Sequence, residues 1–271
     1  MNSLSWKRLL IVTCLGLCAS LSALSAPLQA ADAKELFVAR TFRDAQGNEL
    51  RYRLLLPADY NPACAYPLVI FLHGSGERGD DNLKQLVHGM NDFAKDENRR
   101  RFPCFVFAPQ CPEKKSWAEI DLKIPKHTMS TEATEPTKQV IGAMAALQCE
   151  YTIDPSRIYL TGLSMGGFGT WDLIQRYPDT FAAAVPICGG GDEKQAARLV
   201  NLPIWAFHGS EDKGVVPERS RDMIAAIKQA GGNPRYTEYP GVGHDSWTAT
   251  YADPRMIEWL FSQRLANCVC R

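Results

Sequence analysis

The sequence predicts an α/β domain with a mostly parallel central sheet, and three observations support this prediction. Continuous apolar runs are typical of strands buried on both faces of a parallel sheet, and the chain contains "YPLVIFLHG", "CFVFAP", "RIYLTG", "FAAAVPI" and "PIWAFHG". Helix-like segments alternate with these runs: "TKQVIGAMAALQCEY", "FGTWDLIQRY" and "VPERSRDMIAAIKQAGG". Each run ends in glycine or polar residues, so we expect the functional residues at the carboxyl ends of the strands.

The elements outside the buried runs have their own signals. Residues 36–57 predict an opening β-hairpin, because two strand-like stretches flank the turn "DAQGN". The stretch "NRRR" at 98–101 is interpreted as the solvated end of a helix. The longest polar stretch, residues 113–136, predicts a surface loop at the rim of the functional site. Trp117 is its one large aromatic side chain and is a candidate for stacking on a substrate.

Residues 1–30 predict a secretory signal peptide, and residues 31–271 predict a single domain. "MNSLSWKR" is a basic start, "LLIVTCLGLCASLSALSA" is apolar, and small residues precede a cleavage point near Ala30. A membrane anchor is the alternative, because the run approaches the length of a spanning helix. The serines and Pro27 favour export and cleavage instead. We therefore expect a periplasmic or extracellular protein without stable membrane insertion.

Charge and cysteine content narrow the function classes further. The chain has 30 Lys and Arg residues and 30 Asp and Glu residues, so its formal net charge is +0. It therefore lacks the excess of positive charge that is typical of nucleic-acid-binding proteins. None of the nine cysteines stands in a Cys-x-x-Cys pair, so no metal site is predicted. Cys64 and Cys104 precede two apolar runs that would start side by side as parallel neighbours. This arrangement predicts a Cys64–Cys104 disulfide in the oxidising environment outside the cell.

The stretch "TGLSMGGFG" at 161–169 contains the pattern Gly-x-Ser-x-Gly around Ser164. A strand-like run precedes it and a helix-like segment follows it, which is the context of a nucleophilic serine at a sharp turn. A phosphate-binding loop is the alternative, but the lysine and the spacing of that motif are missing. The sequence therefore predicts that Ser164 is a nucleophile.

A serine nucleophile needs a base and an acid that orients the base. Only two histidines follow Ser164, as the expected order of serine, acid and histidine requires. His208 belongs to a predicted strand and is interpreted as a buried structural residue, whereas His244 lies in the loop "PGVGHDSW" and is the predicted base. Asp212 is the preferred acid because its side chain is short. The alternatives are Glu211, beside it, and Asp192, one strand earlier.

Attack on a carbonyl carbon also needs hydrogen-bond donors for the developing oxyanion. The N–H of Met165 is one candidate, since it follows the nucleophile at the start of a helix. Ser75, preferred over Gly74 in "HGSGERGDDN", is the other candidate. A plain glycine turn with hydrated charges is the alternative interpretation of this stretch.

Four separate stretches resemble α/β-hydrolase-fold serine esterases: "FLHGSGERGDDN", "GLSMGGFGTWDLIQRYPDTFAAAVPICGG", "HGSEDKGVVP" and "GVGHDSW". The resemblance is to secreted carboxylesterases related to polyhydroxyalkanoate depolymerases, feruloyl and acetylxylan esterases, and predicted peptidases. It implies an α/β-hydrolase fold in which Ser164 is the nucleophile, Asp212 the acid and His244 the base. These roles agree with those argued from the residues.

The expected activity is hydrolysis of carboxylic esters through an acyl-serine intermediate, without a metal or organic cofactor. The predicted strands and helices nearly use up the chain between Ser164, Asp212 and His244, which leaves no room for a large apolar lid. We therefore expect small-molecule or polymer-linked substrates, such as short-chain acyl esters or aryl and sugar esters. A serine peptidase on the same fold and a catalytically inactive binding protein are the alternatives.

Overall fold

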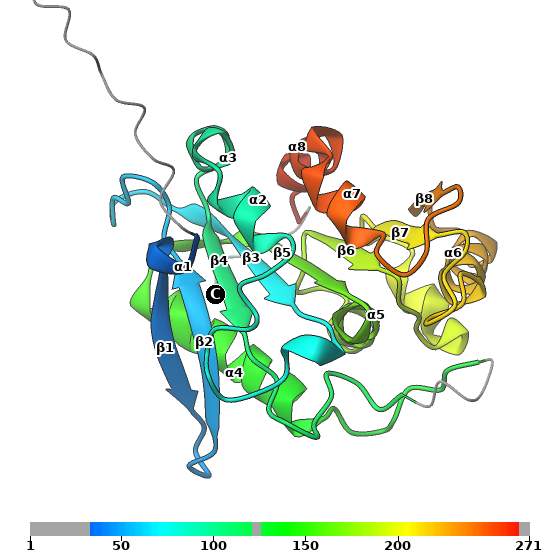
Figure 1. Cartoon of the computed structure of the whole chain (residues 1–271), viewed down its shortest axis with the longest axis horizontal. Coiled ribbons are helices and arrows are strands. Elements are labelled where there is room, and N and C mark those ends of the chain that lie inside the picture. Colours follow the sequence, from blue (N-terminus) through cyan, green and yellow to red (C-terminus); the bar gives the residue numbers. More distant parts are fainter. Residues whose placement is uncertain (1–32, 121–125, 266–271) are drawn as a thin grey trace, which may run out of the picture. The chain divides into compact units, whose positions relative to one another are not determined.

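An eight-stranded sheet runs through the described residues, 33–120 and 126–265, of this computed structural model (Figure 1). The strands are β1 (Phe37–Arg43), β2 (Glu49–Leu55), β3 (Tyr66–Leu72), β4 (Phe105–Pro109), β5 (Ile153–Leu163), β6 (Ala183–Ile187), β7 (Trp205–Gly209) and β8 (Arg235–Tyr239). The α-helices are α1 (Ala33–Leu36), α2 (Met90–Ala94), α3 (Asp96–Arg101), α4 (Glu135–Glu150), α5 (Met165–Arg176), α6 (Glu218–Gln229), α7 (Trp247–Ala252) and α8 (Pro254–Ser262). Two 3₁₀ helices are η1 (Ser75–Glu77) and η2 (Glu193–Leu199).

The strand order is β1-β2-β4-β3-β5-β6-β7-β8. β1 pairs antiparallel with β2, so the predicted opening hairpin is confirmed. β2 pairs antiparallel with β4, and every further pair from β4 to β8 is parallel. The mostly parallel sheet is therefore confirmed as well. β8 was not predicted, because this edge strand is only partly buried and lacks a continuous apolar run.

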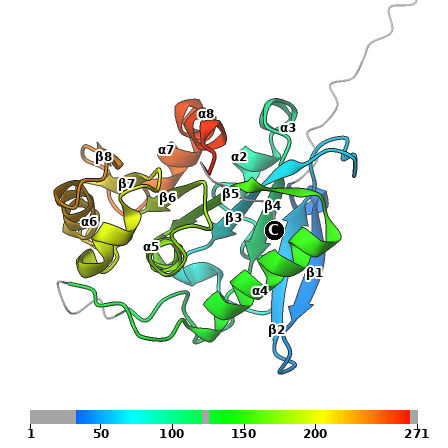
Figure 2. The ribbon, with the colours of Figure 1, turned by 180° about the vertical axis from the view of Figure 1, so that it is seen from behind.

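The buried strands supply side chains to two hydrophobic cores, one on each face of the sheet. In β3, Leu68, Ile70 and Leu72 belong to the core that includes residues of α4, α5 and α6. Val69 and Phe71, between them, belong to the core that includes residues of α2, α7 and α8. Figures 1 and 2 show α4 and α5 on one side of the sheet and α2, α7 and α8 on the other. Burial on both faces explains why these strands are apolar throughout.

Local signals at the helix ends agree with the predicted segments. The hydroxyl of Thr134 accepts a hydrogen bond from the backbone N–H of Thr137, and Pro136 occupies the first turn of α4. α6 ends before Gly231, whose φ of 99° is available to glycine at little cost. α3 ends in three arginines and buries no residue, which confirms the interpretation of "NRRR" as a solvated helix end.

The structure contradicts the predicted disulfide, because Cys64 and Cys104 are both free. β3 and β4 are parallel neighbours as expected, but their register pairs Phe105 with Leu68. Cys104 thus lies beside Pro67 of β3, whereas Cys64 lies three residues before Pro67 in an exposed turn. The prediction that β3 and β4 are neighbours was therefore correct, but the offset between the two strands keeps the thiols of Cys64 and Cys104 apart.

The predicted signal peptide, residues 1–30, lies outside the described residues. Within the described ranges, none of the helices combines the length and the apolar character that are needed to cross a bilayer.

Candidate active site

Ser164 stands at the sharp turn between β5 and α5, with φ 54° and ψ −117°. A positive φ is strained for a residue with a side chain, and a strand-to-helix turn of this kind exposes a nucleophile. The glycines that follow allow the backbone to approach closely. A Cβ atom at Gly166 would lie 1.9 Å from the carbonyl oxygen of Leu72, and one at Gly167 would lie 2.2 Å from that of Ile187.

His244 and Asp212 meet Ser164 in a chain of hydrogen bonds. His244 follows β8, and its Nε2 atom lies 2.9 Å from Ser164 Oγ. Asp212 follows β7, and its Oδ2 atom lies 2.7 Å from His244 Nδ1. A carboxylate only accepts, so the imidazole proton sits on Nδ1 and leaves Nε2 free to accept the serine proton. The three residues selected from the sequence are thus brought together in the geometry of a serine–histidine–aspartate triad.

The surroundings of Asp212 keep its carboxyl group ionised. Burial alone would raise the pKa of this group, but hydrogen bonds from His208, His244 and the Val215 N–H lower the pKa well below its ordinary value. The Oδ1 atom accepts from the N–H groups of Gly214 and Val215 at 2.8 and 2.9 Å. The carboxylate is therefore held in one orientation, with Oδ2 directed at His244.

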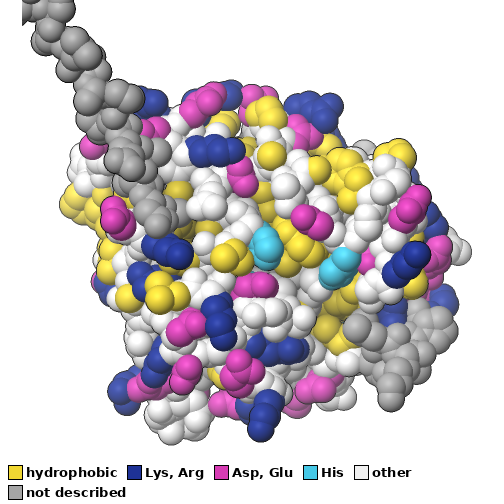
Figure 3. Space-filling model, in the orientation of Figure 1, with side chains coloured by type: hydrophobic (Ala, Val, Ile, Leu, Met, Phe, Trp, Pro, Cys, Tyr) yellow, Lys and Arg dark blue, Asp and Glu magenta, His cyan; other side chains and the backbone are white. Residues whose placement is uncertain are grey.

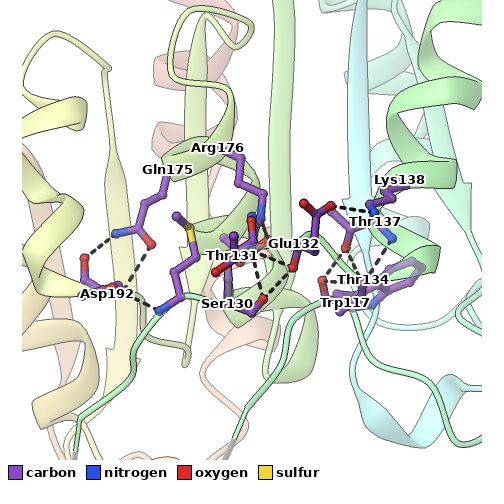
Figure 4. Close-up of polar contacts among 12 residues, drawn as sticks. Trp117, Ser130, Thr131, Glu132, Thr134, Thr137, Lys138, Gln175, Arg176 and Asp192 are labelled. Carbon is purple, nitrogen blue, oxygen red and sulfur yellow. Dashed lines mark hydrogen bonds and ion pairs between the residues drawn. The ribbon is translucent and has the colours of Figure 1, made fainter.

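Asp192, the reserve candidate for the acid, is engaged elsewhere (Figure 4). Its carboxylate accepts from the N–H groups of Met129 and Lys194, and its backbone bonds the side chain of Gln175. Glu211 is exposed, unlike its buried neighbour Asp212. The contacts with His244 therefore belong to Asp212.

A cavity of about 240 Å³ opens beside the nucleophile. Its lining residues are Ser75, Arg78, Ser116, Ala118, Glu119, Ile120, Ser164, Met165, Phe168 and Val215. Ser75 begins η1, separated from the end of β3 by His73 and Gly74, and Met165 is the first residue of α5. The N–H groups in the first turn of a helix have no acceptor within the helix, so the N–H of Met165 is suited to bind an incoming anion.

Trp117 does not lie at the substrate rim, which corrects the prediction. Its side chain is 0% exposed, and its Nε1 donates to the carbonyl oxygen of His73 at 3.0 Å. Its own carbonyl oxygen accepts from the hydroxyl groups of Thr134 and Thr137, before and within the first turn of α4 (Figure 4). An aromatic residue in a polar stretch was expected at the surface, but its ring completes the core between α5 and this loop.

The described parts of the polar stretch that precede α4 form a loop as predicted, and residues 116–120 include several that line the cavity. Residues 121–125 lie outside the described residues. Arg176 of α5 holds the later part, because its guanidinium donates to the carbonyl oxygens of Ser130 and Thr131 (Figure 4). The same guanidinium pairs with the buried Asp172 at 2.7 Å. The loop is thereby fixed to the helix that begins at the nucleophile.

Sequence reasoning missed a polar chain on the other side of His244. The ring of Trp247 meets that of His244 edge to face, with centroids 5.2 Å apart. Trp247 Nε1 donates to His88 Nδ1 at 3.1 Å, and His88 Nε2 lies 3.6 Å from a carboxylate oxygen of Glu77. This chain links the loop after β3 to the loop of the base. The aromatic residue in "GVGHDSW" was its one sequence signal.

Possible metal ligands coincide with this site. Among the described residues, the ligand atoms of Cys188, Asp212 and His244 lie within 4.8 Å of one another. Cys188 is buried, and burial raises the pKa of its thiol, which disfavours the thiolate that a metal would need. The other two ligands are already hydrogen-bonded to each other. The donor set therefore fits proton transfer better than a resident metal.

The cavity beside Ser164 is lined by side chains of both charges, Arg78 and Glu119. On the face drawn in Figure 3, basic and acidic side chains are interspersed, and histidine side chains are visible near hydrophobic ones. The His244 side chain is 33% exposed, whereas that of Asp212 is 0% exposed. The base can therefore meet a substrate from solvent while the acid is shielded behind it.

Comparison with known proteins agrees with this geometry. Residues 105–255, more than half of the chain, match the profile of the dienelactone hydrolase family. The chain belongs to this family. It is 51% identical to Poly(3-hydroxyalkanoate) depolymerase C from Paucimonas lemoignei over 39% of this chain and 30% of that protein. It is 25% identical to "Probable carboxylesterase SOBER1-like" from Arabidopsis thaliana over 66% of this chain and 73% of that protein.

Solved structures give the same fold for this family member. A thermostable esterase superposes with a TM-score of 0.79 at 44% identity, over 85% of this chain and 64% of that one. The chain therefore spans slightly less than two thirds of that esterase. A ferulic acid esterase and a dipeptidyl peptidase match at 18% and 16% identity, which shows a shared fold alone. The predicted α/β-hydrolase fold and the resemblance to carboxylesterase-type hydrolases are confirmed.

Proposed function

We propose that the protein is an exported serine esterase that hydrolyses soluble carboxylic esters through an acyl intermediate on Ser164. The observation that carries the proposal is the continuous chain from Ser164 Oγ through His244 to Asp212, with distances of 2.9 and 2.7 Å. This chain opens onto a cavity of a size that suits a small acyl group. Export is supported by the basic, apolar and small-residue pattern of residues 1–30.

In the first half of the reaction, Ser164 Oγ attacks the ester carbonyl carbon while His244 Nε2 takes the serine proton. The carbonyl oxygen becomes an oxyanion, and we assign the N–H groups of Met165 and Ser75 as its donors because both residues line the cavity beside the nucleophile. Asp212 stabilises the positive charge that forms on the imidazole. The carbon–oxygen bond to the alcohol then breaks, and His244 passes its proton to the leaving oxygen.

In the second half, water replaces the alcohol. His244 takes a proton from the water, whose oxygen attacks the acyl carbon and forms a second oxyanion at the same donors. The bond to Ser164 Oγ breaks, and the serine regains its proton from His244. The products are a carboxylic acid and an alcohol, and water is the second reactant.

The cavity beside Ser164 supports small or flat acyl groups. Its wall includes Ala118, Phe168 and Val215, which form a small apolar cluster, and its rim includes Arg78 and Glu119. An apolar wall with a charged rim suits short-chain acyl or aryl groups attached to a soluble or polymer-linked alcohol. The chain from Ser164 to His244 is taken up by α5, β6, η2, β7, α6 and β8, so it contributes no inserted lid.

The test compares the purified protein with its Ser164→Ala variant on soluble p-nitrophenyl esters of increasing acyl length. We expect hydrolysis and labelling by a fluorophosphonate probe in the wild type only, because the variant lacks the attacking oxygen. Equal melting temperatures would show that the variant is folded. Full activity in a folded variant would exclude Ser164 as the nucleophile, and faster cleavage of amides than of matched esters would favour a peptidase.

A further inference from the structure

His208 contacts the acid of the proposed triad, although the mechanism above gives it no role. It is the penultimate residue of β7 and is 0% exposed. Its Nε2 atom lies 2.8 Å from the carbonyl oxygen of Val215 and 3.3 Å from Asp212 Oδ2. Its Nδ1 atom lies 2.8 Å from Ser220 Oγ. Both ring nitrogens are therefore engaged, one of them at the catalytic acid.

The partners of His208 determine where its proton lies. A backbone carbonyl oxygen and an ionised carboxylate only accept hydrogen bonds, so Nε2 must carry a hydrogen. On the other side, the hydroxyl of Ser220 can accept from Nδ1 and donate to the carbonyl oxygen of Gly189 at 3.0 Å, or donate to Nδ1 itself. The Nε2–H group is thus required in either arrangement.

This Nε2–H group bonds the carbonyl oxygen of Val215 at 2.8 Å and also lies close to the carboxylate of Asp212, with 3.3 Å between Nε2 and Oδ2. A carboxylate has about four lone-pair sites. Gly214 N and Val215 N donate to Oδ1, and His244 Nδ1 donates to Oδ2. His208 Nε2 faces the remaining site of Oδ2. Because His208 also bonds the Val215 carbonyl oxygen, one side chain contacts both the acid and the loop that carries it.

We propose that His208 is a positioning residue for catalysis: it orients Asp212 toward His244 and thereby favours proton transfer from Ser164. The inference rests on the proposed function, since it assigns a part in the same reaction. The charged groups that face His208 are Asp212 and, on the adjacent strand β8, Glu238, which Arg221 of α6 holds by an ion pair. His208 thus lies between the acid and the edge of the sheet.

Two substitutions separate this role from simple packing. In His208→Gln the amide nitrogen is three bonds beyond Cβ, as Nε2 is in histidine, so the donor to Val215 and Asp212 is retained. In His208→Asn the nitrogen is two bonds beyond Cβ, as Nδ1 is, so only the contact with Ser220 is retained. Both variants carry a side-chain amide, so comparing them tests the hydrogen-bond donor at the Nε2 position while the polarity of the side chain stays nearly the same.

We expect His208→Asn to lower kcat by as much as about 100-fold, because small displacements of catalytic groups have effects of this size. KM should stay within about twofold of wild type, since His208 does not line the cavity. The acid limb of the kcat/KM profile should move to higher pH, because a carboxylate with fewer donors holds the His244 proton more tightly. His208→Gln should recover most of kcat, and Ser220→Ala, which keeps the Nε2 contacts, should leave kcat unchanged.

A folded His208→Asn protein with wild-type kcat and pH profile would overturn the inference. A His208→Gln protein whose kcat is no higher than that of His208→Asn would overturn it as well. The wild type supplies a test that needs no variant: ¹⁵N NMR of the histidine rings should show His208 Nε2 protonated in the resting protein. An unprotonated Nε2 would also overturn the inference. Absence of ester hydrolysis by the wild type would instead refute the proposed function, and the NMR result would be unaffected.

Discussion

Replacing Asp212 by asparagine should nearly abolish turnover while preserving the fold, and the structure says why. Two backbone N–H groups, from Gly214 and Val215, donate to Oδ1. The amide oxygen of asparagine must take this position, because the NH₂ group there would face two donors and leave them unsatisfied, at about 1–3 kcal/mol each. The NH₂ group is then directed at His244 Nδ1.

That orientation imposes the wrong tautomer on the base. His244 Nδ1 must accept from the amide, so the imidazole proton moves to Nε2, the atom 2.9 Å from Ser164 Oγ. A protonated Nε2 cannot take the serine proton. The equivalent change in serine proteases lowers kcat by about 10⁴, which corresponds to about 5 kcal/mol of transition-state stabilisation. We expect a loss of this order for Asp212→Asn.

The assay is the hydrolysis of p-nitrophenyl acetate, measured as kcat and KM alongside thermal unfolding. Glu211→Gln is the matched control, because it removes an exposed carboxylate from the adjacent residue and should keep kcat within about twofold of wild type, as surface changes have small effects. A native-like Asp212→Asn protein that retains more than a tenth of wild-type kcat would refute the reasoning. A loss of about 10⁴ in Asp192→Asn instead would transfer the role of the acid to that residue.

Three further predictions concern residues that pack around the active site. Gly166→Ala places a Cβ atom 1.9 Å from the carbonyl oxygen of Leu72 and should destabilise the fold by about 3 kcal/mol or more; Gly76→Ala, which meets nothing within 4 Å, should leave the melting temperature unchanged. Trp117→Phe should lower stability by about 2 kcal/mol through the lost bond to His73, whereas a raised KM at unchanged stability would restore Trp117 to the substrate rim. Burial lowers the pKa of His73 to about 4, so between pH 6.5 and 4 the unfolded chain binds a proton that the folded chain does not. The free energy of unfolding should therefore fall by about 3 kcal/mol as the pH decreases through this range, and a pH slope equally steep in His73→Gln would contradict this assignment.

The sequence by itself determined the features that depend on local order along the chain. Strands buried on both faces must be apolar throughout, so the parallel strands could be recognised one by one. The turn at Ser164 needs glycine where its backbone meets the strand ends, so the nucleophile could be recognised as well. The chain order of serine, acid and base then selected Asp212 and His244 as candidates.

Only the tertiary structure decided what depends on register and on contacts between distant segments. The offset between β3 and β4 separates Cys64 from Cys104, although the two strands are neighbours. The packing of α5 against the polar loop buries Trp117, although Lys115 and Glu119 lie only two residues away in the sequence. The sequence around His208 is that of an ordinary strand. The turn after β7 nevertheless places the carboxylate of Asp212 next to the His208 ring. Local patterns report how a residue suits its own strand or helix, whereas its partners are fixed by how separate elements pack together.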